Sequence, residues 1–337
     1  MSAMDHWHPV MLASALGKAP RLAQVWGREV VVFRGEGGRV GALDERCPHR
    51  GMRLSKGKVE GDRIVCPYHG WCYGRDGQGE SPGTPRLKAR AVSYEVVERH
   101  GAIWIKPEGV AARFPDVGAS GHHPLGALHH RIEAPLEVVL DNFTEVEHTP
   151  TAHLFLGYDP GRVAQVVTRV EVGERTVRVV NRGPQKPLPR LLMRLFGIEP
   201  GDDFIDEWVT GFSPVHALYD HWWADPRTGQ RRPESLRIGV VMTPPDAERV
   251  DLFVFAHTSR PFSGRLGLNR WVIKPLTRRL IDHEVGLDKN ILEHLADKGV
   301  GIEGKKLSRF DRPMGEHRRM IERLYKGIDE PEAQPME

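Results

Sequence analysis

The spacing of hydrophobic and polar residues divides the chain into two parts. Over residues 26–106, short apolar runs alternate with glycine-rich breaks, as in "REVVVFRGEGGRVGAL" at residues 28–43. Such runs predict β-strands joined by tight hairpin turns. A looser stretch, rich in Gly, Pro and Ala, follows at residues 107–130 and has no apolar period. We place a domain boundary there, with one domain over residues 1–115 and a second over residues 116–337.

The second part mixes helical and strand patterns. Apolar residues recur at helical spacing between residues 136 and 143, whereas residues 167–180 and 252–255 alternate as strands do. Residues 276–299 predict a helix that closes at Gly299. Residues 187–198 ("PLPRLLMRLFGI") are apolar and basic at helical spacing, and we interpret them first as a packed surface helix. The two patterns together predict an α+β protein.

Composition excludes several classes of partner. The 337 residues carry a formal net charge of +3, which gives no support for a nucleic-acid partner. No apolar run approaches the ~18 residues that a transmembrane segment needs. The N-terminus lacks a basic stretch followed by an apolar block, so secretion is not expected. Three cysteines do not form a disulfide framework and suit a reducing compartment, and we therefore expect a cytoplasmic protein.

Two of the cysteines belong to a repeated motif that predicts a metal centre. "CPHRG" places Cys47 two residues before His49, and "CPYHGW" places Cys66 three residues before His69, with proline after each cysteine. Both motifs lie on Gly- and Pro-rich loops between predicted strands. In a Rieske [2Fe–2S] centre one iron takes two thiolates and the other takes two imidazoles. Two loops that each give one Cys and one His fit that division.

Structural zinc is the alternative for these four residues, since zinc also accepts two thiolates and two imidazoles. The common zinc motifs, however, pair cysteine with cysteine and histidine with histidine, whereas each pair here is mixed. The mixed pairs favour the [2Fe–2S] cluster.

A second metal site is predicted in "DNFTEVEHTPTAH" at residues 141–153. His148 and His153 lie five apart across a break at "TP", and such a pair also arises by chance among seventeen histidines. Non-haem Fe(II) oxygenases use two histidines and one carboxylate, with open positions for O₂ and substrate. Asp288 is the candidate carboxylate, and Asp282 and Glu284 compete with it. The pairs at residues 122–123 and 129–130 lie in the linker-like stretch and are interpreted as solvated.

These motifs, together with "LDKNILE" at residues 287–293, resemble the oxygenase component (α subunit) of Rieske non-haem iron ring-hydroxylating oxygenases. The similarity is greatest to the homotrimeric group of O-demethylases and monooxygenases and covers most of the chain. The resemblance implies an all-β Rieske [2Fe–2S] domain, then a catalytic domain whose curved antiparallel sheet is covered by helices. It also implies that His148, His153 and Asp288 hold a mononuclear Fe(II).

The resemblance further implies a carboxylate three residues before the first iron histidine. That carboxylate would link His69 of one subunit to His148 of its neighbour. Most members have aspartate there, whereas this chain has Glu145, which is similar to quaternary-amine oxygenases. Asn142 either approaches the metal or is an ordinary helix residue.

The function expected from these residues is O₂-dependent hydroxylation, by mono- or dioxygenation, of an apolar, aromatic or alicyclic small molecule. Because no flavin or carrier motif is visible, electrons must come from a separate NAD(P)H-dependent reductase, a ferredoxin or both. The alternatives are oxidative demethylation of an ether or quaternary amine, and an electron carrier without oxygenase activity. Pocket candidates are Phe155, Leu156, Tyr158 and the strands at residues 204–212 and 252–257.

Overall fold

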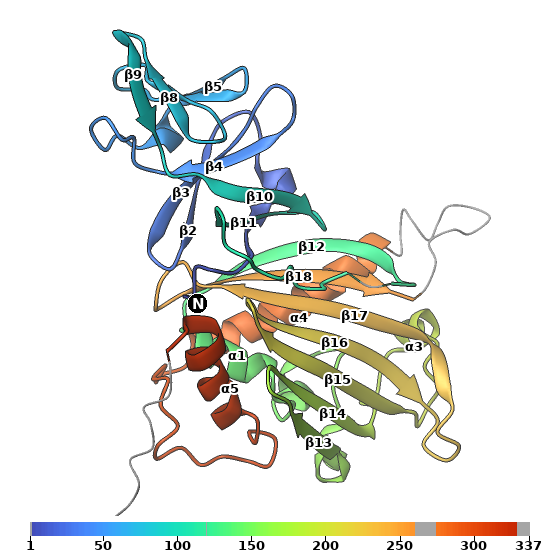
Figure 1. The fold of residues 1–337 in the computed structure, drawn as a ribbon. Coiled ribbons are helices and arrows are strands. Elements are labelled where there is room, and N and C mark those ends of the chain that lie inside the picture. The colour runs from blue at the N-terminus through green and yellow to red at the C-terminus, as the bar shows by residue number, and fades with distance from the viewer. Residues whose placement is uncertain (1, 119, 260–273, 329–337) are drawn as a thin grey trace, which may run out of the picture.

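The computed structural model describes residues 2–118, 120–259 and 274–328. Figure 1 shows an N-terminal group of small sheets standing on the end of a larger sheet that carries helices. β11 ends at Pro107 and β12 begins at His123, so the proposed boundary between residues 115 and 116 falls in the connection between them. The prediction of an α+β protein, with an all-β N-terminal part, is confirmed.

Three antiparallel sheets make up the N-terminal part. Their strand orders are β1-β11-β10, β2-β3-β4 and β5-β6-β7-β8-β9. Glycines with positive φ close several of the hairpins, as at Gly27 and Gly38. The elements are β1 (His8–Leu12), η1 (Ala13–Ala15), β2 (Arg21–Val25), β3 (Arg28–Arg34), β4 (Val40–Asp44), η2 (Leu54–Lys56), β5 (Lys58–Glu60), β6 (Arg63–Val65), β7 (Cys72–Tyr73), β8 (Gln78–Ser81), β9 (Thr84–Arg90), β10 (Tyr94–Arg99) and β11 (Ala102–Pro107).

A seven-stranded antiparallel sheet forms the C-terminal part, in the order β12-β18-β17-β16-β15-β14-β13. Buried and partly buried positions alternate along most of β16, so alternate side chains point toward the helices and away from them. By contrast, β18 is buried at every position, because both of its faces are covered. The strands are β12 (His123–Ile132), β13 (Val167–Val172), β14 (Thr176–Pro184), β15 (Asp203–Phe212), β16 (Val215–Ala224), β17 (Arg231–Thr243) and β18 (Val250–Thr258).

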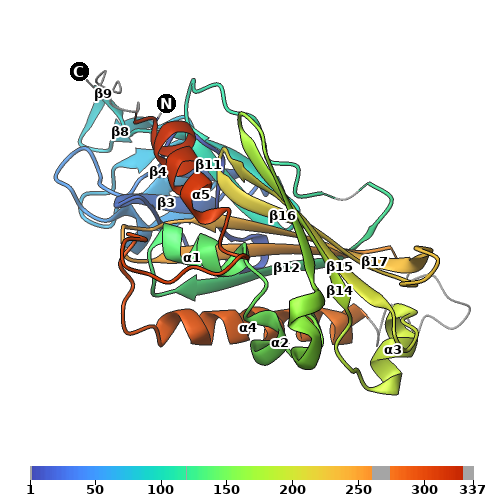
Figure 2. The same ribbon diagram turned by 90° about the horizontal axis from the view of Figure 1, so that it is seen from below.

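Helices lie on the concave face of this sheet. Figure 2 shows α4 running across that face beside α2, with the strands curving around them. The apolar residues predicted at helical spacing form α1, whose Val139 and Leu140 are fully buried in the main core. The helices are α1 (Leu136–Phe143), α2 (Thr149–Ala152), η3 (Pro160–Gln165), α3 (Arg190–Phe196), α4 (Lys274–Glu293), α5 (Met314–Met320) and the π-helix η5 (Ile321–Lys326).

An aromatic cluster joins the two parts of the chain. Trp104 of β11 stacks on Phe255 of β18, with 5.4 Å between the ring centroids. Phe253 and Val241 extend the same cluster on the convex face of the large sheet. Burial of these side chains fixes the N-terminal part against β17 and β18.

Two sequence-based interpretations differ from the structure. Part of the stretch interpreted as a linker is β12, an edge strand whose alternation is interrupted by a bulge at Pro124–Gly126. His129 and His130 therefore lie on a strand, and each contacts a carboxylate, at 2.9 Å (Asp251 Oδ1) and 2.8 Å (Asp282 Oδ1).

The helix predicted to reach Gly299 ends at Glu293. There the N–H of His294 donates to the carbonyl of Ile291, three residues back, and not to that of Asn290, as an α-helix would require. The carbonyl of Asn290 instead forms a hydrogen bond with Nδ1 of the His294 side chain. The predicted helix within residues 187–198 forms α3, with Phe196 buried and Leu191 exposed. Among the described residues, no helix is both long and apolar enough to cross a membrane.

Candidate active site

Two loops of the N-terminal part bring the four predicted cluster residues together. Each loop begins at a cysteine and is closed by the same pair of backbone hydrogen bonds. The cysteine N–H donates to the carbonyl five residues later, at 2.9 Å for Cys47 and 2.7 Å for Cys66. The N–H four residues later donates back to the cysteine carbonyl, at 2.8 Å for Gly51 and 3.1 Å for Gly70. Both glycines have a φ of +70°, which favours glycine at this point of each loop.

The loops separate the thiols from the imidazoles by depth. Cys47 and Cys66 are each only 2% exposed, whereas His49 is half-buried and His69 is exposed. The two imidazole rings are 4.6 Å apart between centroids. Buried thiols below and imidazoles toward the surface are the donor set that a Rieske [2Fe–2S] cluster divides between its two irons.

Polar groups lie beside the sulfur atoms of Cys47 and Cys66. Burial raises the pKa of the Cys66 thiol, and backbone N–H groups of Tyr68 and His69 at the sulfur oppose that rise. The hydroxyl of Tyr73 lies 3.2 Å from Cys47 Sγ. Burial, and then the nearby thiols, raise the pKa of Tyr73 far above its ordinary value, so its phenol stays a hydrogen-bond donor. The residues therefore fit a cluster held by thiolates.

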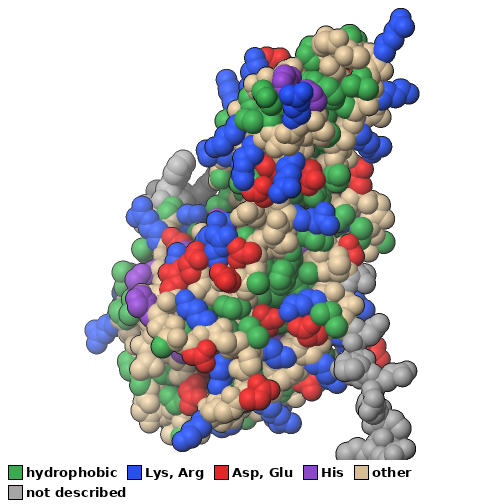
Figure 3. Space-filling model, turned by 90° about the vertical axis from the view of Figure 1, so that its left-hand side faces the viewer, with side chains coloured by type: hydrophobic (Ala, Val, Ile, Leu, Met, Phe, Trp, Pro, Cys, Tyr) green, Lys and Arg blue, Asp and Glu red, His purple; other side chains and the backbone are tan. Residues whose placement is uncertain are grey.

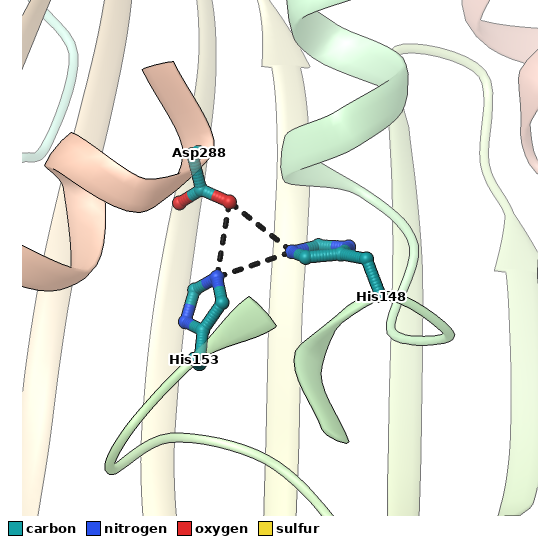
Figure 4. A group of neighbouring side chains, drawn as sticks. All are labelled: His148, His153 and Asp288. Atoms are coloured by element: carbon teal, nitrogen blue, oxygen red, sulfur yellow. Dashed lines mark hydrogen bonds and ion pairs between the residues drawn. The ribbon is translucent and has the colours of Figure 1, made fainter. Parts of the chain in front are cut away.

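The second group of predicted ligands converges on the concave face of the large sheet. His148 lies at the start of α2, His153 directly follows α2, and Asp288 projects from α4 (Figure 4). The two Nε2 atoms are 3.2 Å apart, and Asp288 Oδ1 lies 3.1 Å from that of His148 and 3.0 Å from that of His153. One atom from each residue therefore occupies a corner of a nearly regular triangle.

The size of this triangle fits a metal ion. Ligand atoms at right angles around an ion, with bonds of about 2.1 Å, lie about 3 Å from one another. The three atoms thus match one face of an octahedron and leave the opposite face for O₂ and substrate, as in the two-histidine, one-carboxylate iron sites. Asp282, one competing carboxylate, lies away from the triangle, at His130.

Glu284, the other competing carboxylate, supports the segment that carries His153 instead of joining the triangle. Its two oxygens accept the backbone N–H groups of Leu154, Phe155 and Leu156 at 3.0–3.3 Å. One of them also lies 3.1 Å from His153 Nδ1, at ion-pair distance but without hydrogen-bond alignment. This arrangement orients the His153 ring.

Lys186 holds the same segment from its carbonyl side. Its ammonium donates to the carbonyl oxygens of Pro150, at 3.2 Å, and of His153. The end of α2 is thus fixed by a cation on its carbonyls and by Glu284 on the N–H groups that follow.

Glu145 and Asn142 contact the other two predicted ligands. The carboxylate of Glu145 contacts His148 Nδ1 and also accepts the backbone N–H of His148 at 3.4 Å. Asn142 donates to Asp288 Oδ1 at 2.9 Å. This hydrogen bond orients the Asp288 carboxylate.

Charge at the triangle favours a bound cation. Burial alone would lower the pKa values of His148 and His153, but the nearby carboxylates of Asp288 and of Glu145 or Glu284 raise them to about 10 and about 9. Burial would raise the pKa of Asp288, and the two imidazoles hold it well below its usual range. The buried Asp288 carboxylate thus stabilises positive charge on the two imidazoles beside it. A divalent metal ion can supply that positive charge instead.

The triangle opens into a cavity between the helices and the sheet. Of the predicted pocket residues, Leu156, Phe204, Asp206 and Trp208 line it, whereas Phe155, Tyr158 and the strand at 252–257 do not. The full lining is Asn142, Phe143, Glu145, His148, Thr149, His153, Leu156, Gly157, Phe204, Asp206, Trp208, Tyr219, His221, Ile238, Val240, Ile281, Glu284, Val285 and Asp288.

Asp206 and His221 were missed as individual candidates from the sequence. Asp206 interrupts an otherwise apolar alternation between Phe204 and Trp208, and that interruption was the available signal. His221 has no comparable signal, because its place opposite Asp206 depends on strand register.

Comparison with known proteins agrees with this fold. Residues 6–95 match the Rieske [2Fe–2S] domain, and residues 132–327 match the vanillate O-demethylase oxygenase C-terminal domain. The chain is 30% identical over 273 residues to the oxygenase component of chloroacetanilide N-alkylformylase from Rhizorhabdus wittichii (strain DC-6 / KACC 16600), covering 74% of each protein. It is 35% identical over 158 residues to chloroplastic chlorophyllide a oxygenase from Arabidopsis thaliana, covering 44% of this chain and 29% of that protein.

A solved structure supports the same fold. Dicamba monooxygenase bound to 3,6-dichlorosalicylic acid superposes with a TM-score of 0.78 at 19% identity, covering 96% of this chain and 97% of that one. The chain belongs to the Rieske non-haem iron oxygenases, with a C-terminal domain of the vanillate O-demethylase oxygenase type. Membership implies a [2Fe–2S] cluster, and the triangle is a possible site for a mononuclear metal.

Proposed function

We propose that this chain is the oxygenase component of a Rieske system that hydroxylates an apolar, aromatic or alicyclic small molecule. The observation that carries the proposal is the triangle of His148, His153 and Asp288 at the wall of a largely apolar cavity. An electron carrier without oxygenase activity has no use for such a site. The presence of a second donor set in the same chain therefore favours the enzyme.

Cys47, His49, Cys66 and His69 would hold the cluster, and His148, His153 and Asp288 would hold the mononuclear iron. Bound there, the cluster supplies single electrons and the iron activates O₂ for insertion into a C–H bond.

The protein groups around the triangle keep it in a reactive arrangement. Glu145 on Nδ1 of His148 leaves Nε2 of that ring to the metal, and Glu284 has the same effect on His153. Asn142 holds the carboxylate of Asp288. The apolar side chains of Ile238, Val240 and their neighbours exclude water and surround a substrate ring.

Oxidative demethylation is the second candidate. Hydroxylation of an O- or N-methyl carbon gives an unstable product that loses the carbon as formaldehyde, so the same site serves both reactions. The match of residues 132–327 to the vanillate O-demethylase type supports this candidate.

The electron donor is proposed to be a separate reductase, a ferredoxin or both, docking at the cluster end of the molecule. Residues 46–90 hold ten Lys or Arg and four Asp or Glu, a formal charge of +6, against +3 for the whole chain. Figure 3 shows Lys and Arg side chains spread around this end, close to histidine. A basic surface of this kind attracts an acidic donor.

A homotrimer in a cytoplasmic setting remains part of the proposal. Electrons would have to pass from the cluster, at His69, to the mononuclear iron, at His148 and its partner Glu145. Among the described residues, no hydrogen bond or ion pair joins His69 to Glu145 within one chain. A neighbouring subunit would supply the exposed His69 to Glu145. All three cysteines are free, which suits a reducing compartment.

The test is turnover under ¹⁸O₂ with the reduced protein and a panel of aromatic methyl ethers and alicyclic alcohols. We expect labelled product or formaldehyde from the wild type. His148→Ala and Glu145→Gln should abolish both while leaving the visible spectrum of the cluster intact, and Glu147→Gln is the matched control because its side chain is exposed. Retained turnover in His148→Ala would overturn the proposal.

A further inference from the structure

A row of polar side chains crosses the concave face of the large sheet, and two of them, Asp206 and His221, line the candidate cavity. Asn181, Asp206 and His221 stand opposite one another on β14, β15 and β16. They are 0%, 6% and 6% exposed. The next row in the same direction is aromatic, with Trp208 opposite Tyr219. Polar side chains buried this deeply are costly unless they find partners.

Several polar atoms in this part of the cavity have incomplete partners among the described residues. Asp206 Oδ1 lies 3.0 Å from His221 Nε2, at ion-pair distance but without hydrogen-bond alignment. His221 Nδ1 and Trp208 Nε1 have no hydrogen-bond partner within the described chain. All three residues line the same cavity as the metal triangle. A ligand that brings a donor and an acceptor would satisfy them.

The charge of the cavity wall limits which ligand can do so. Four carboxylates line the cavity, and none of its described lining residues is Lys or Arg. A divalent iron at the triangle offsets only two of those charges. Burial, followed by the charges of Asp206, Asp288 and Glu145, raises the pKa of the Tyr219 phenol far above its usual value. An anionic substrate would therefore enter a region of negative potential, with no Lys or Arg among the described lining residues to pair with.

Asp206 differs from the other three carboxylates in what it contacts. Glu145, Glu284 and Asp288 are all engaged with the histidine ligands or their backbone. Asp206 projects from the sheet between Asn181 and His221, and its one ion-pair partner among the described residues is His221. It is the carboxylate left for a substrate.

We propose that Asp206, with His221 and Trp208, forms a substrate-anchoring site that accepts a hydroxyl or N–H donor and disfavours a carboxylate. The substrate is then an uncharged ring compound with a donor group, and its apolar part lies against Ile238, Val240 and Val285. This inference rests on the proposed function and specifies its substrate class. Where the donor group is a hydroxyl, the indole N–H of Trp208 donates to its oxygen, so the site both accepts from and donates to that group.

The experiment measures binding to the iron-loaded, oxidised protein by calorimetry, without turnover. Three matched pairs serve as probes: vanillyl alcohol and vanillate, 4-methoxybenzyl alcohol and 4-methoxybenzoate, and cyclohexylmethanol and cyclohexanecarboxylate. In each pair the molecules differ in charge and hardly in size. We expect the alcohol to bind at least about tenfold more tightly than the carboxylate in at least one pair.

Asp206→Asn should reduce that preference to about threefold or less, because the amide removes the negative charge and keeps the shape. Glu207→Gln is the matched control: it is the next residue on β15, faces the opposite side of the sheet and pairs with Arg178, so the preference should not change. Unchanged iron content and melting temperature would show that Asp206→Asn is folded.

A preference below about tenfold in every pair, binding of neither member of any pair, or a preference that survives in Asp206→Asn would overturn the proposal. Because binding is read without turnover, these outcomes are distinct from a failure of the oxygenase function, which the ¹⁸O₂ test measures separately.

Discussion

The two candidate metal sites are built in opposite ways. The cluster residues lie within residues 47–69, and each loop is closed by its own backbone hydrogen bonds. The triangle joins His148 and His153 to Asp288, a residue far along the chain on a different helix. The first site is a local motif, whereas the second exists only when α4 lies across the concave face of the sheet.

The sites also differ in exposure. His69 is exposed at the basic end of the molecule, while His153 and Asp288 are buried beside a cavity. An exposed imidazole suits contact with another protein, and a buried triangle suits reaction with a small molecule out of contact with water. Changes to one site should therefore leave the other intact, and the predictions below test this independence.

The largest effect is expected when a ligand of either site is removed. His153→Ala should abolish product formation and lower iron by about one atom per chain while the cluster spectrum remains, because the three-atom site loses a corner. Cys66→Ser should remove the cluster spectrum and sulfide. Metal analysis and visible spectroscopy check both, with His130→Ala as a control outside the triangle. Loss of the cluster in His153→Ala would contradict the independence of the sites.

Glu284→Gln should weaken iron binding by about 10- to 100-fold without removing it. Both oxygens of Glu284 accept backbone N–H groups. In the glutamine variant, the side-chain NH₂ group would face one of these N–H donors, and the lost hydrogen bond would loosen the segment that carries His153. Competition with a chelator measures the affinity. Asp282→Asn, two residues earlier with an exposed carboxylate, should bind iron as the wild type does, and equal weakening in both variants would rule out this role.

Tyr73→Phe should lower the reduction potential of the cluster by roughly 40 mV. The phenol donates toward Cys47 Sγ, and a donor stabilises the more negative reduced state by about 1 kcal/mol, which for one electron corresponds to that shift. Potentiometric titration followed by electron paramagnetic resonance measures it. Tyr68→Phe is the control, because Tyr68 is exposed; an unchanged potential in Tyr73→Phe would remove the tuning role.

The smallest effect is expected at the basic surface. Arg50→Gln with Lys56→Gln should slow cluster reduction by an acidic ferredoxin a few-fold at low salt and flatten its dependence on ionic strength. Neither residue forms an ion pair within the described part of the chain. Stopped-flow reduction measures the rate, and Arg312→Gln on the C-terminal part should not alter it. If the rate of cluster reduction by the ferredoxin did not depend on salt in the wild type, electrostatic attraction of the ferredoxin to this surface would be contradicted.

The sequence could predict the local features more fully than the long-range ones. Cys47, His49, Cys66 and His69 were predictable because their spacing, prolines and glycines are all local. The strands of the N-terminal part followed from their glycine-rich turns for the same reason. The edge strand β12 was not predictable, because a bulge at Gly126 interrupts its alternation.

The triangle was only partly predictable. His148 and His153 are close in sequence, but the choice of Asp288 over Glu284 depends on which face of α4 meets α2. The resemblance to a family supplied what spacing alone did not. His221 was out of reach, because its partner Asp206 is set by the register of β15 and β16.

The most direct test of two metal sites in one chain is iron, zinc and acid-labile sulfide analysis of anaerobically purified protein, with an electron paramagnetic resonance spectrum after dithionite. The account predicts about three irons and two sulfides per chain with a Rieske-type signal, as one [2Fe–2S] cluster and one mononuclear iron require. Two irons and two sulfides that do not rise to three irons on addition of Fe(II), or zinc without sulfide, would contradict it.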